Sequence, residues 1–504
     1  MGCQPLAFLL LCFCVVSTSA DNEHNYSELQ VVDDATGRGV PLVELRTVNN
    51  IRFVTDSAGR VAINSPELLD SEIYFHIFSH GYEYPSDKFG YRGCKIKLVS
   101  GKSNVIRLKR INIAERLYRV TGAGIYRDSV LLEKPVPIQQ PLINAQVFGS
   151  DSVVNAVYRG KIHWFWGDTN RPNYPLGNFQ VPGATSLLPQ DGGLNPKEGV
   201  NLKYYVAKTG FAKPTAAMPG EGPTWINGLV VLEPPKSKQE MFASYVKVKP
   251  PMKIYEKGLV RFNDDRKEFE HVTTFDMQSP LLPGGHPLIH PDGEQSYVYF
   301  ATPYPTVRVR ANANALKDPA QYQTYTYLKP GSRKDDVQVE RDSRGQLVYG
   351  WKRDTIPLTQ QMETKLVAAN KIQDTDGLFQ TKDVETGKPI QLHNGSVYWN
   401  PYRQRWIMIA VERLGHSMLG EVWFLESDSL TGPWPRARKI LTHQQYSFYN
   451  PKQHPMLDRE EGRYIYFEGT YTNMFSGNPT PTPRYDYNQI MYQLDLADPR
   501  LKRD

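Results

Sequence analysis

Short runs of alternating apolar and polar residues, separated by turns rich in Asp, Gly and Pro, recur along most of the chain. Residues 28–110 contain a first group of such runs. Two strands lie within 29–45 around a Thr-Gly turn, a similar pair lies within 54–63, and a closing strand spans 104–110. Alternation with a period of two predicts β-strands that bury one face. This part of the chain is therefore expected to form a small β-structure.

The turns of this first group follow a recognisable pattern. Val31 to Pro41 matches V-x-D-x-x-T-G-x-x-(I/V)-P, Thr55 to Gly59 matches T-D-x-x-G, and a Gly-Tyr strand follows at Gly81. The segment resembles the transthyretin-like, carboxypeptidase-regulatory type of β-sandwich. The resemblance implies an accessory module over residues 21–112, without chemistry of its own. Deleting it is expected to leave the rest of the chain folded and active on small substrates.

The remaining residues contain a repeated unit: an apolar strand, a polar turn and an aromatic-rich strand. Four copies begin at Ser152, His286, Ser396 and His454, and a degenerate fifth runs from 225 to 245. No helical period separates the copies, and repeated hairpins of this kind are typical of a β-propeller. The sequence thus predicts an all-β protein.

In that all-β protein, an N-terminal β-sandwich is followed by a five-bladed β-propeller over residues 113–504, the expected catalytic domain. The ring is expected to close by pairing residues 119–130 with 490–496.

Composition and charge limit the classes of partner that the protein is expected to bind. The 504 residues include 59 Lys and Arg and 53 Asp and Glu, a net charge of +6, without a long basic run. This distribution predicts no nucleic-acid partner. Aromatic residues make up 12% of the chain, with 30 Tyr, which favours strands and surfaces that face sugars or peptides.

The N-terminus predicts export. An apolar run over 6–16 ends in Thr-Ser-Ala at 18–20, which is typical of a signal peptide over residues 1–20 and is too short to span a bilayer. The mature chain would keep Cys94 alone and form no internal disulfide. No other run of 18 residues is apolar, so no transmembrane segment is expected. The predicted location is secreted or periplasmic.

Asp151 and Asp168 begin and end the first hairpin of the repeat, in Gly-Ser-Asp-Ser and Trp-Phe-Trp-Gly-Asp-Thr. Each alone could be an ordinary turn residue. The hairpin resembles the first blade of five-bladed glycoside hydrolases, namely the endo-D-arabinanase type and, more loosely, families 43 and 117. The resemblance implies paired acidic residues that act on a sugar. Hydrolysis of a glycosidic bond requires one protonated acid and one ionised partner, and these two Asp are the leading catalytic pair.

Glu468 is the third catalytic candidate. It follows Tyr464-Ile-Tyr-Phe, and strand alternation puts it on the face of Tyr464 and Tyr466. An acidic residue in an aromatic strand is costly to bury without a partner or a purpose. A structural ion pair is the alternative explanation.

Three histidines are further candidates for the functional site. His286 and His454 each precede Pro at the same phase of the repeat, and His393 lies just upstream of that phase. They could cap strands, bind substrate, act as an acid, as the resemblance to family 117 implies, or hold a divalent cation with Asn394 and Asn450. No zinc-binding or EF-hand motif is present, so no cofactor is required, and a structural or channel cation stays open.

The predicted function is that of a secreted glycoside hydrolase acting on a polysaccharide or its oligosaccharides. A non-catalytic glycan-binding propeller and a polysaccharide lyase using His and Tyr are the alternatives. The candidate substrate-binding residues are aromatic, amide, imidazole and guanidinium side chains near expected strand ends: Trp166, Arg171, Trp225, Asn227, His286, His393, Asn394, Asn450, His454 and Tyr471.

Overall fold

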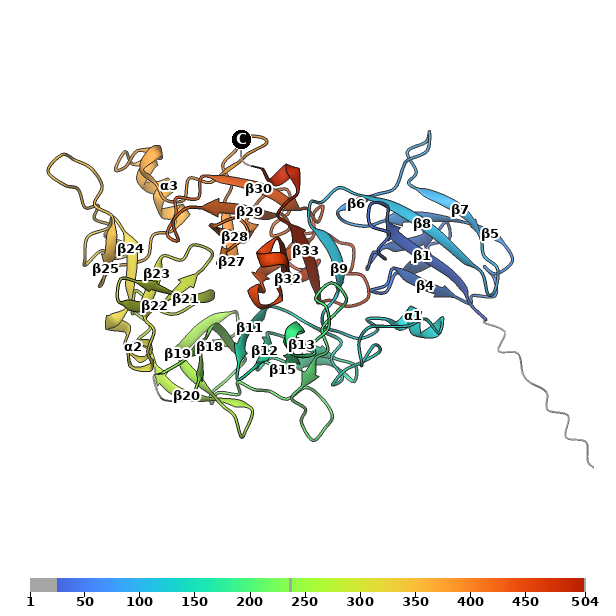
Figure 1. Ribbon diagram of the computed structural model, residues 1–504, viewed down its shortest axis with the longest axis horizontal. Helices are drawn as coiled ribbons and strands as arrows, with labels where there is room; N and C mark the ends of the chain where they lie inside the picture. Colours follow the sequence, from blue (N-terminus) through green and yellow to red (C-terminus); the bar gives the residue numbers. More distant parts are fainter. Residues whose placement is uncertain (1–24, 235–237, 503–504) are drawn as a thin grey trace, which may run out of the picture.

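The computed structural model describes residues 25–234 and 238–502, which form two groups of β-sheets lying side by side (Figure 1). The signal peptide predicted for residues 1–20 lies outside the described residues. Within them, the α-helices are short: α1 (Arg127–Leu131), α2 (Ala313–Lys317) and α3 (Gln360–Ala368). No helix in the described part has the length and apolar character needed to cross a bilayer.

The first group is a pair of four-stranded sheets, with strand orders β4-β1-β8-β6 and β3-β2-β5-β7. Alternation along the strands places Leu29, Val31, Phe75 and Leu108 in a common core. The eight strands are β1 (Ser27–Asp33), β2 (Glu44–Thr47), β3 (Arg52–Val54), β4 (Arg60–Ile63), β5 (Glu72–Phe78), β6 (Tyr82–Glu83), β7 (Gly93–Lys97) and β8 (Ser103–Arg110).

Five further sheets follow along the chain, each built mainly from consecutive antiparallel strands. The first contains β11 (Val153–Tyr158), β12 (Lys161–Trp166), β15 (Gly183–Leu187) and β16 (Lys203–Tyr204), and the second contains β17 (Thr224–Leu232), β18 (Glu240–Lys249), β19 (Lys253–Asn263) and β20 (Glu268–Thr274). The third contains β21 (His286–Asp292), β22 (Gln295–Ala301), β23 (Val307–Arg310), β24 (Gln323–Thr326) and β25 (Gly350–Lys352).

The last two sheets complete the series. The fourth contains β27 (Leu392–Asn400), β28 (Arg405–Glu412), β29 (Val422–Ser427) and β30 (Arg436–Leu441), with the short β26 (Lys382–Asp383) at its edge. The fifth contains β31 (Ser447–Gln453), β32 (Tyr464–Thr472), β33 (Asn488–Asp495) and β9 (Glu115–Arg119). A small separate sheet consists of β10 (Gly149–Ser150), β13 (Thr169–Arg171) and β14 (Tyr174–Asn178), and β10 contacts β33.

The first strands of the five sheets contact one another in a closed ring, in the order β11, β17, β21, β27, β31 and back to β11. A ring of antiparallel sheets is the architecture of a β-propeller, and the predicted all-β fold class is confirmed. The ring closes where β9 pairs with β33, with Ile490 opposite Arg119 and Gln493 opposite Glu115. The closing strand β9 ends at Arg119, so the predicted segment 119–130 contributes only its first residue to the pairing. The backbone turns away at Gly122, whose φ is +113°.

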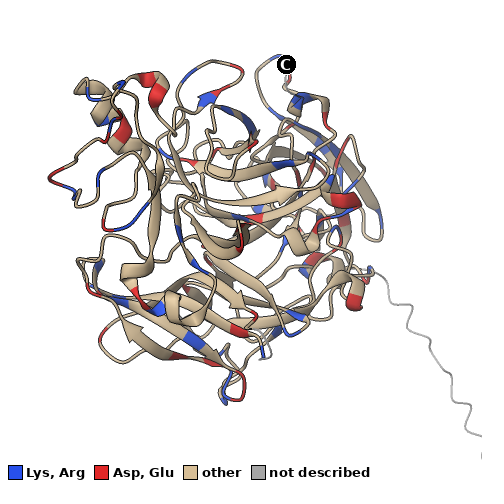
Figure 2. Cartoon of the chain, turned by 60° about the vertical axis from the view of Figure 1, so that its left-hand side comes forward, with Lys and Arg blue, Asp and Glu red and all other residues tan. Residues whose placement is uncertain are grey.

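The N-terminal pair of four-stranded sheets, called the sandwich below because the two sheets share one core, packs directly against this ring. The buried guanidinium of Arg116, just inside the ring, donates hydrogen bonds to the backbone oxygens of Pro41 (3.0 Å) and His80 (2.6 Å). Leu42 of the sandwich belongs to the same apolar core as Ile440 of the ring. The boundary predicted near residue 112 thus falls inside a continuous packed region. Charges of both signs are interspersed over loops and strands (Figure 2).

Candidate active site

A cavity of about 430 Å³ lies at the ends of the five first strands, and each of the five sheets contributes side chains to its wall. Cavities of this size are typical of small-ligand sites. Eight of the thirteen residues selected from the sequence line it: Asp151, Trp166, Trp225, Asn227, His286, His393, Asn394 and Asn450. They meet because each first strand begins beside the axis of the ring.

Asp151 lies two residues before β11 and is partly exposed to the cavity. The Tyr449 hydroxyl donates a hydrogen bond to its Oδ2 (2.9 Å), and the backbone N–H of Asp151 donates to the backbone oxygen of Asp168 (3.0 Å). Burial, and secondarily the charge of Asp168, raises the pKa of Asp151 to about 7, although the Tyr449 hydrogen bond lowers it. The carboxyl is therefore poised to exchange a proton near neutral pH.

Asp168 lies just behind the cavity wall. The indole N–H of Trp225, which lines the cavity, donates to Asp168 Oδ1 (3.0 Å). Burial raises the pKa of Asp168, and the indole hydrogen bond lowers it. The charge of Asp168 is also one of the causes that raise the pKa of Asp151, so the two carboxyl groups do not ionise independently.

A chain of short hydrogen bonds fixes the backbone next to Asp151. Asn394 donates to the side-chain oxygen of Asn450 (2.6 Å), and Asn450 donates to the Ser152 hydroxyl (2.6 Å). Ser152 (φ +40°) and Asn450 (φ +51°) both lie in the left-handed region. Asn tolerates this region better than Ser does, and such conformations concentrate at functional sites. Tyr449 and Asn450 therefore hold Asp151 and Ser152 in place by hydrogen bonds between residues 298 positions apart in the chain.

The histidines of the cavity are neutral groups. Burial lowers the pKa of His286 well below its ordinary value, and it lowers the pKa of His393 in the same direction. The Nδ1 atoms of both are buried without a hydrogen-bond partner among the described residues. They can accept or donate a hydrogen bond to a ligand, whereas a permanent positive charge is excluded near pH 7.

Glu468 and His454 do not line the cavity, and the placement predicted for His454 at the start of a first strand was wrong. Glu468 is fully buried in β32, and its Oε1 lies 3.8 Å from His454 Nε2. Burial raises the pKa of Glu468 to about 8, so it is protonated at neutral pH and is not an ionised partner for Asp151. His454 follows β31 instead of beginning a first strand, because two 3₁₀ turns between β31 and β32 shift the phase of the repeat. An amide N–H of Asn155 donates to His454 Nδ1 (2.9 Å).

Two further candidates lie elsewhere. The Tyr471 hydroxyl is hydrogen-bonded to His80 Nδ1 (2.7 Å) in the contact between the sandwich and the ring, so it is not a cavity residue. Arg171 lines a separate groove beside the cavity. Both were selected by their place near strand ends, but a strand end does not determine the direction of the following segment.

Sequence reasoning missed the apolar rim of the cavity. Met252 and Phe475 line it and are 69% and 61% exposed, and Met418 and Leu419 join them. The Phe475 ring lies 5.6 Å from the Tyr449 ring. These residues come from loops outside the repeat, and the Pro-Pro-Met turn at Met252 was the one signal available in the sequence.

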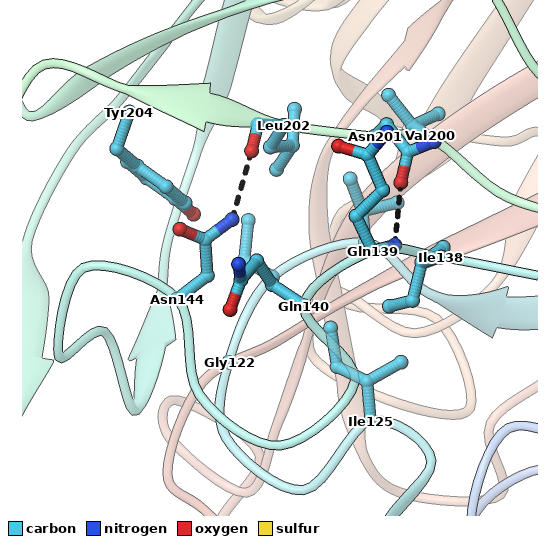
Figure 3. A pocket seen from close by; sticks show the side chains of 12 residues that line it. Gly122, Ile125, Ile138, Gln139, Gln140, Asn144, Val200, Asn201, Leu202 and Tyr204 are labelled. Carbon is cyan, nitrogen blue, oxygen red and sulfur yellow. Dashed lines mark hydrogen bonds between the residues drawn. The ribbon is translucent and has the colours of Figure 1, made fainter. Parts of the chain in front are cut away.

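No group of three or more His, Cys, Asp or Glu within 25–234 and 238–502 is arranged to hold a metal ion. The divalent cation considered from the sequence stays a prediction. A smaller hollow between residues 120–144 and 200–204 is crossed by a hydrogen bond from Asn144 to the Leu202 backbone oxygen (2.8 Å) and measures about 20 Å³ (Figure 3). Such a space holds a water molecule and not a sugar.

No protein-family model and no curated protein matches this sequence. Among solved structures, a presumed hydrolase from Bacteroides ovatus ATCC 8483 is similar with a TM-score of 0.40 and 13% identity, over 69% of this chain and 86% of that one. An exo-β-1,3-galactanase from Phanerochaete chrysosporium gives 0.37 and 11%, over 76% and 65% of the chains. An α-L-arabinanase from Cellvibrio cellulosa gives 0.36 and 10%, over 69% and 91%. Likenesses of this strength carry no argument, and the chain's own geometry must support any function.

Proposed function

We propose that this protein is an exported glycoside hydrolase that cleaves a neutral polysaccharide or its oligosaccharides in the cavity at the end of the ring. The proposal has three further parts. A signal peptide over residues 1–20 is cleaved, the ring consists of five propeller blades, and residues 21–112 form an accessory sandwich of the transthyretin-like type. One observation carries it: the Asp151 carboxyl, with a pKa of about 7, opens into a sugar-sized cavity next to a second carboxyl, Asp168.

The two carboxyl groups have different tasks in this mechanism. Asp151, protonated near neutral pH, donates its proton to the leaving glycosidic oxygen. Asp168, the ionised partner in this proposal, stabilises from behind the wall the positive charge that develops at the anomeric carbon. The Asp151 carboxylate left after proton donation then accepts the proton of the attacking water. Trp225 holds Asp168 through its indole N–H, which keeps the ionised carboxylate in one orientation.

The wall of the cavity favours a neutral sugar. Its described lining contains no Lys or Arg, and its one acidic side chain is that of Asp151. An anionic uronate would meet repulsion there without a cation to offset its desolvation. This disfavours the lyase alternative, which needs a uronate substrate. The indoles of Trp166 and Trp225 and the amides of Asn227 and Asn394 suit the apolar faces and hydroxyl groups of a neutral sugar.

The direct test is the release of reducing ends from a panel of neutral glycans. Wild-type protein is compared with Asp151→Asn and Asp168→Asn, and Asp335→Asn, an exposed residue, is the matched control. The proposal expects release by the wild type and the control and a severe loss in the two site variants. Binding without release would instead support a glycan-binding propeller, and equal release by all four proteins would rule out this catalytic pair.

The pH dependence of cleavage tests the role of Asp151. An acid must be protonated, so kcat/KM should fall as the pH rises through about 7. Tyr449→Phe removes a hydrogen bond that lowers the pKa of Asp151, so the falling limb should move to higher pH in this variant. The measurement is the pH profile of both proteins. A limb at the same pH in both would show that Tyr449 does not act on the titrating group.

Gly167 is required next to Asp151. A Cβ at this position would lie 2.1 Å from Asp151 Oδ1, so Gly167→Ala should displace the carboxyl and reduce kcat by about 100-fold. The control is Gly350→Ala, where a Cβ would meet no atom within 4 Å. Rates of reducing-end release and thermal unfolding are measured for both. An unchanged rate in Gly167→Ala would show that the observed carboxyl position does not matter for catalysis.

A further inference from the structure

An open groove of about 500 Å³ lies beside the cavity. The hairpin of β13 and β14 forms one side and residues 207–223 form the other. Asn178 ties the two sides together by donating to the Ala212 backbone oxygen (3.1 Å). The groove contains Arg171, which was selected from the sequence but has no place in the cavity.

The linings of the groove and the cavity come close together along two short segments of the chain. Pro223 lines the groove, and Trp225, two residues later, lines the cavity. In the other segment, Asp168 accepts the Trp225 hydrogen bond, and Arg171, three residues later, lines the groove. The hydrogen-bonded Asp168–Trp225 pair therefore lies between the two hollows, next to the carboxyl groups proposed for catalysis.

Arg171 is arranged as a fixed donor in this groove. Its guanidinium lies over the Tyr174 ring (5.4 Å) and the Phe211 ring (5.7 Å), and its Nε donates to the Leu176 backbone oxygen (3.0 Å). No ion pair involving Arg171 occurs among the described residues, and no carboxylate is found in the described lining of the groove. The terminal nitrogens are thus available to hydroxyl groups, with two aromatic rings beside them.

We infer that this groove is a second sugar subsite, which binds the part of the glycan chain that continues past the sugar held in the cavity. The inference rests on the proposed function and makes it more specific: the substrate is an oligosaccharide or polysaccharide, and the bond cleaved lies beside the Asp168–Trp225 pair. Arg171 donates hydrogen bonds to hydroxyl groups of the second sugar, and Tyr174, 55% exposed beside it, contributes an apolar surface.

The experiment measures how affinity depends on chain length. Arabinotriose, galactotriose, xylotriose and cellotriose and the matching monosaccharides are titrated by calorimetry into Asp151→Asn, which binds without turnover. A monosaccharide fills the cavity alone, whereas a trisaccharide reaches the groove. The trisaccharide should bind more tightly than its monosaccharide, and adding Arg171→Ala should reduce this gain by about tenfold. Tyr174→Ala, at a 55% exposed ring, should reduce it in the same direction.

Arg159→Ala is the matched control, because Arg159 also lies over a tyrosine ring, that of Tyr158 (5.0 Å), but belongs to a different sheet, in the turn between β11 and β12 and away from the groove. It should leave the gain unchanged. A trisaccharide that binds no better than its monosaccharide, or a gain kept in Arg171→Ala, would overturn the subsite. Failure of the hydrolase proposal has a different signature, since it removes reducing-end release by the wild type and leaves this binding comparison intact.

Discussion

Replacing Asp151 by Asn should reduce the rate of glycan cleavage by about 1,000-fold, because the variant cannot donate the proton that the leaving oxygen requires. Asn has nearly the same shape and can still accept the hydrogen bond from Tyr449, which is 2.9 Å from Oδ2 in the wild type. The cavity should therefore keep its geometry, and sugar binding should persist. Steady-state rates and calorimetric affinities measured on the same preparation separate the two effects.

At pH values above neutral, the same substitution should make the protein more stable than the wild type. The folded-state pKa of Asp151, about 7, lies above its ordinary value of 3.8, so the folded state holds a proton that the unfolded state releases. Stability contributed by this group is present at low pH and is lost as the pH rises toward 7. Asn does not titrate, so Asp151→Asn should unfold at a higher temperature than wild type at pH 8. A slow variant that is also less stable there would point to a structural role for Asp151.

Replacing Arg116 by Met should lower the free energy of unfolding by about 3–5 kcal/mol. The guanidinium is 2% exposed and donates to Pro41 O, His80 O, the Ser79 hydroxyl (3.2 Å) and the Tyr492 hydroxyl (3.1 Å). Met fills a similar volume but leaves these acceptors buried without a donor. Urea denaturation measures the effect.

Arg107→Met is the control for this experiment, since Arg107 lies on the sandwich surface with its side chain 63% exposed. Its substitution should change stability by less than about 0.5 kcal/mol. A loss of the same small size in Arg116→Met would show that the contact between sandwich and ring contributes little to stability.

This contact bears on the expectation that residues 21–112 can be removed. Leu42 packs into the core of the ring with Ile440 and Leu441, and His80 is hydrogen-bonded to Tyr471. Deletion would expose this apolar core and leave the Tyr471 hydroxyl without its partner. The expectation stays a prediction, and the packed contact counts against it.

Part of the candidate site could be predicted from the sequence, because a propeller repeats the same geometry in each blade. Each hairpin begins at the axis, so polar residues at the starts of first strands converge. This is why Asp151, Trp225, His286 and Asn394 line one cavity. The same rule failed for His454, where two 3₁₀ turns lie between the strands of the hairpin. An alignment of aromatic residues could not detect this shift, because the apolar pattern is preserved in the strands before and after the two turns.

The sequence by itself determined the strands, their turns and the ring, because side-chain alternation and turn residues act over a few neighbouring positions. Only the tertiary structure decided which groups control Asp151. Its hydrogen-bond donor, Tyr449, is 298 residues away in the chain, and its pKa depends on burial by the assembled ring. Electrostatics and desolvation depend on distances in space, and no local pattern records which distant segments the closing of the ring brings together.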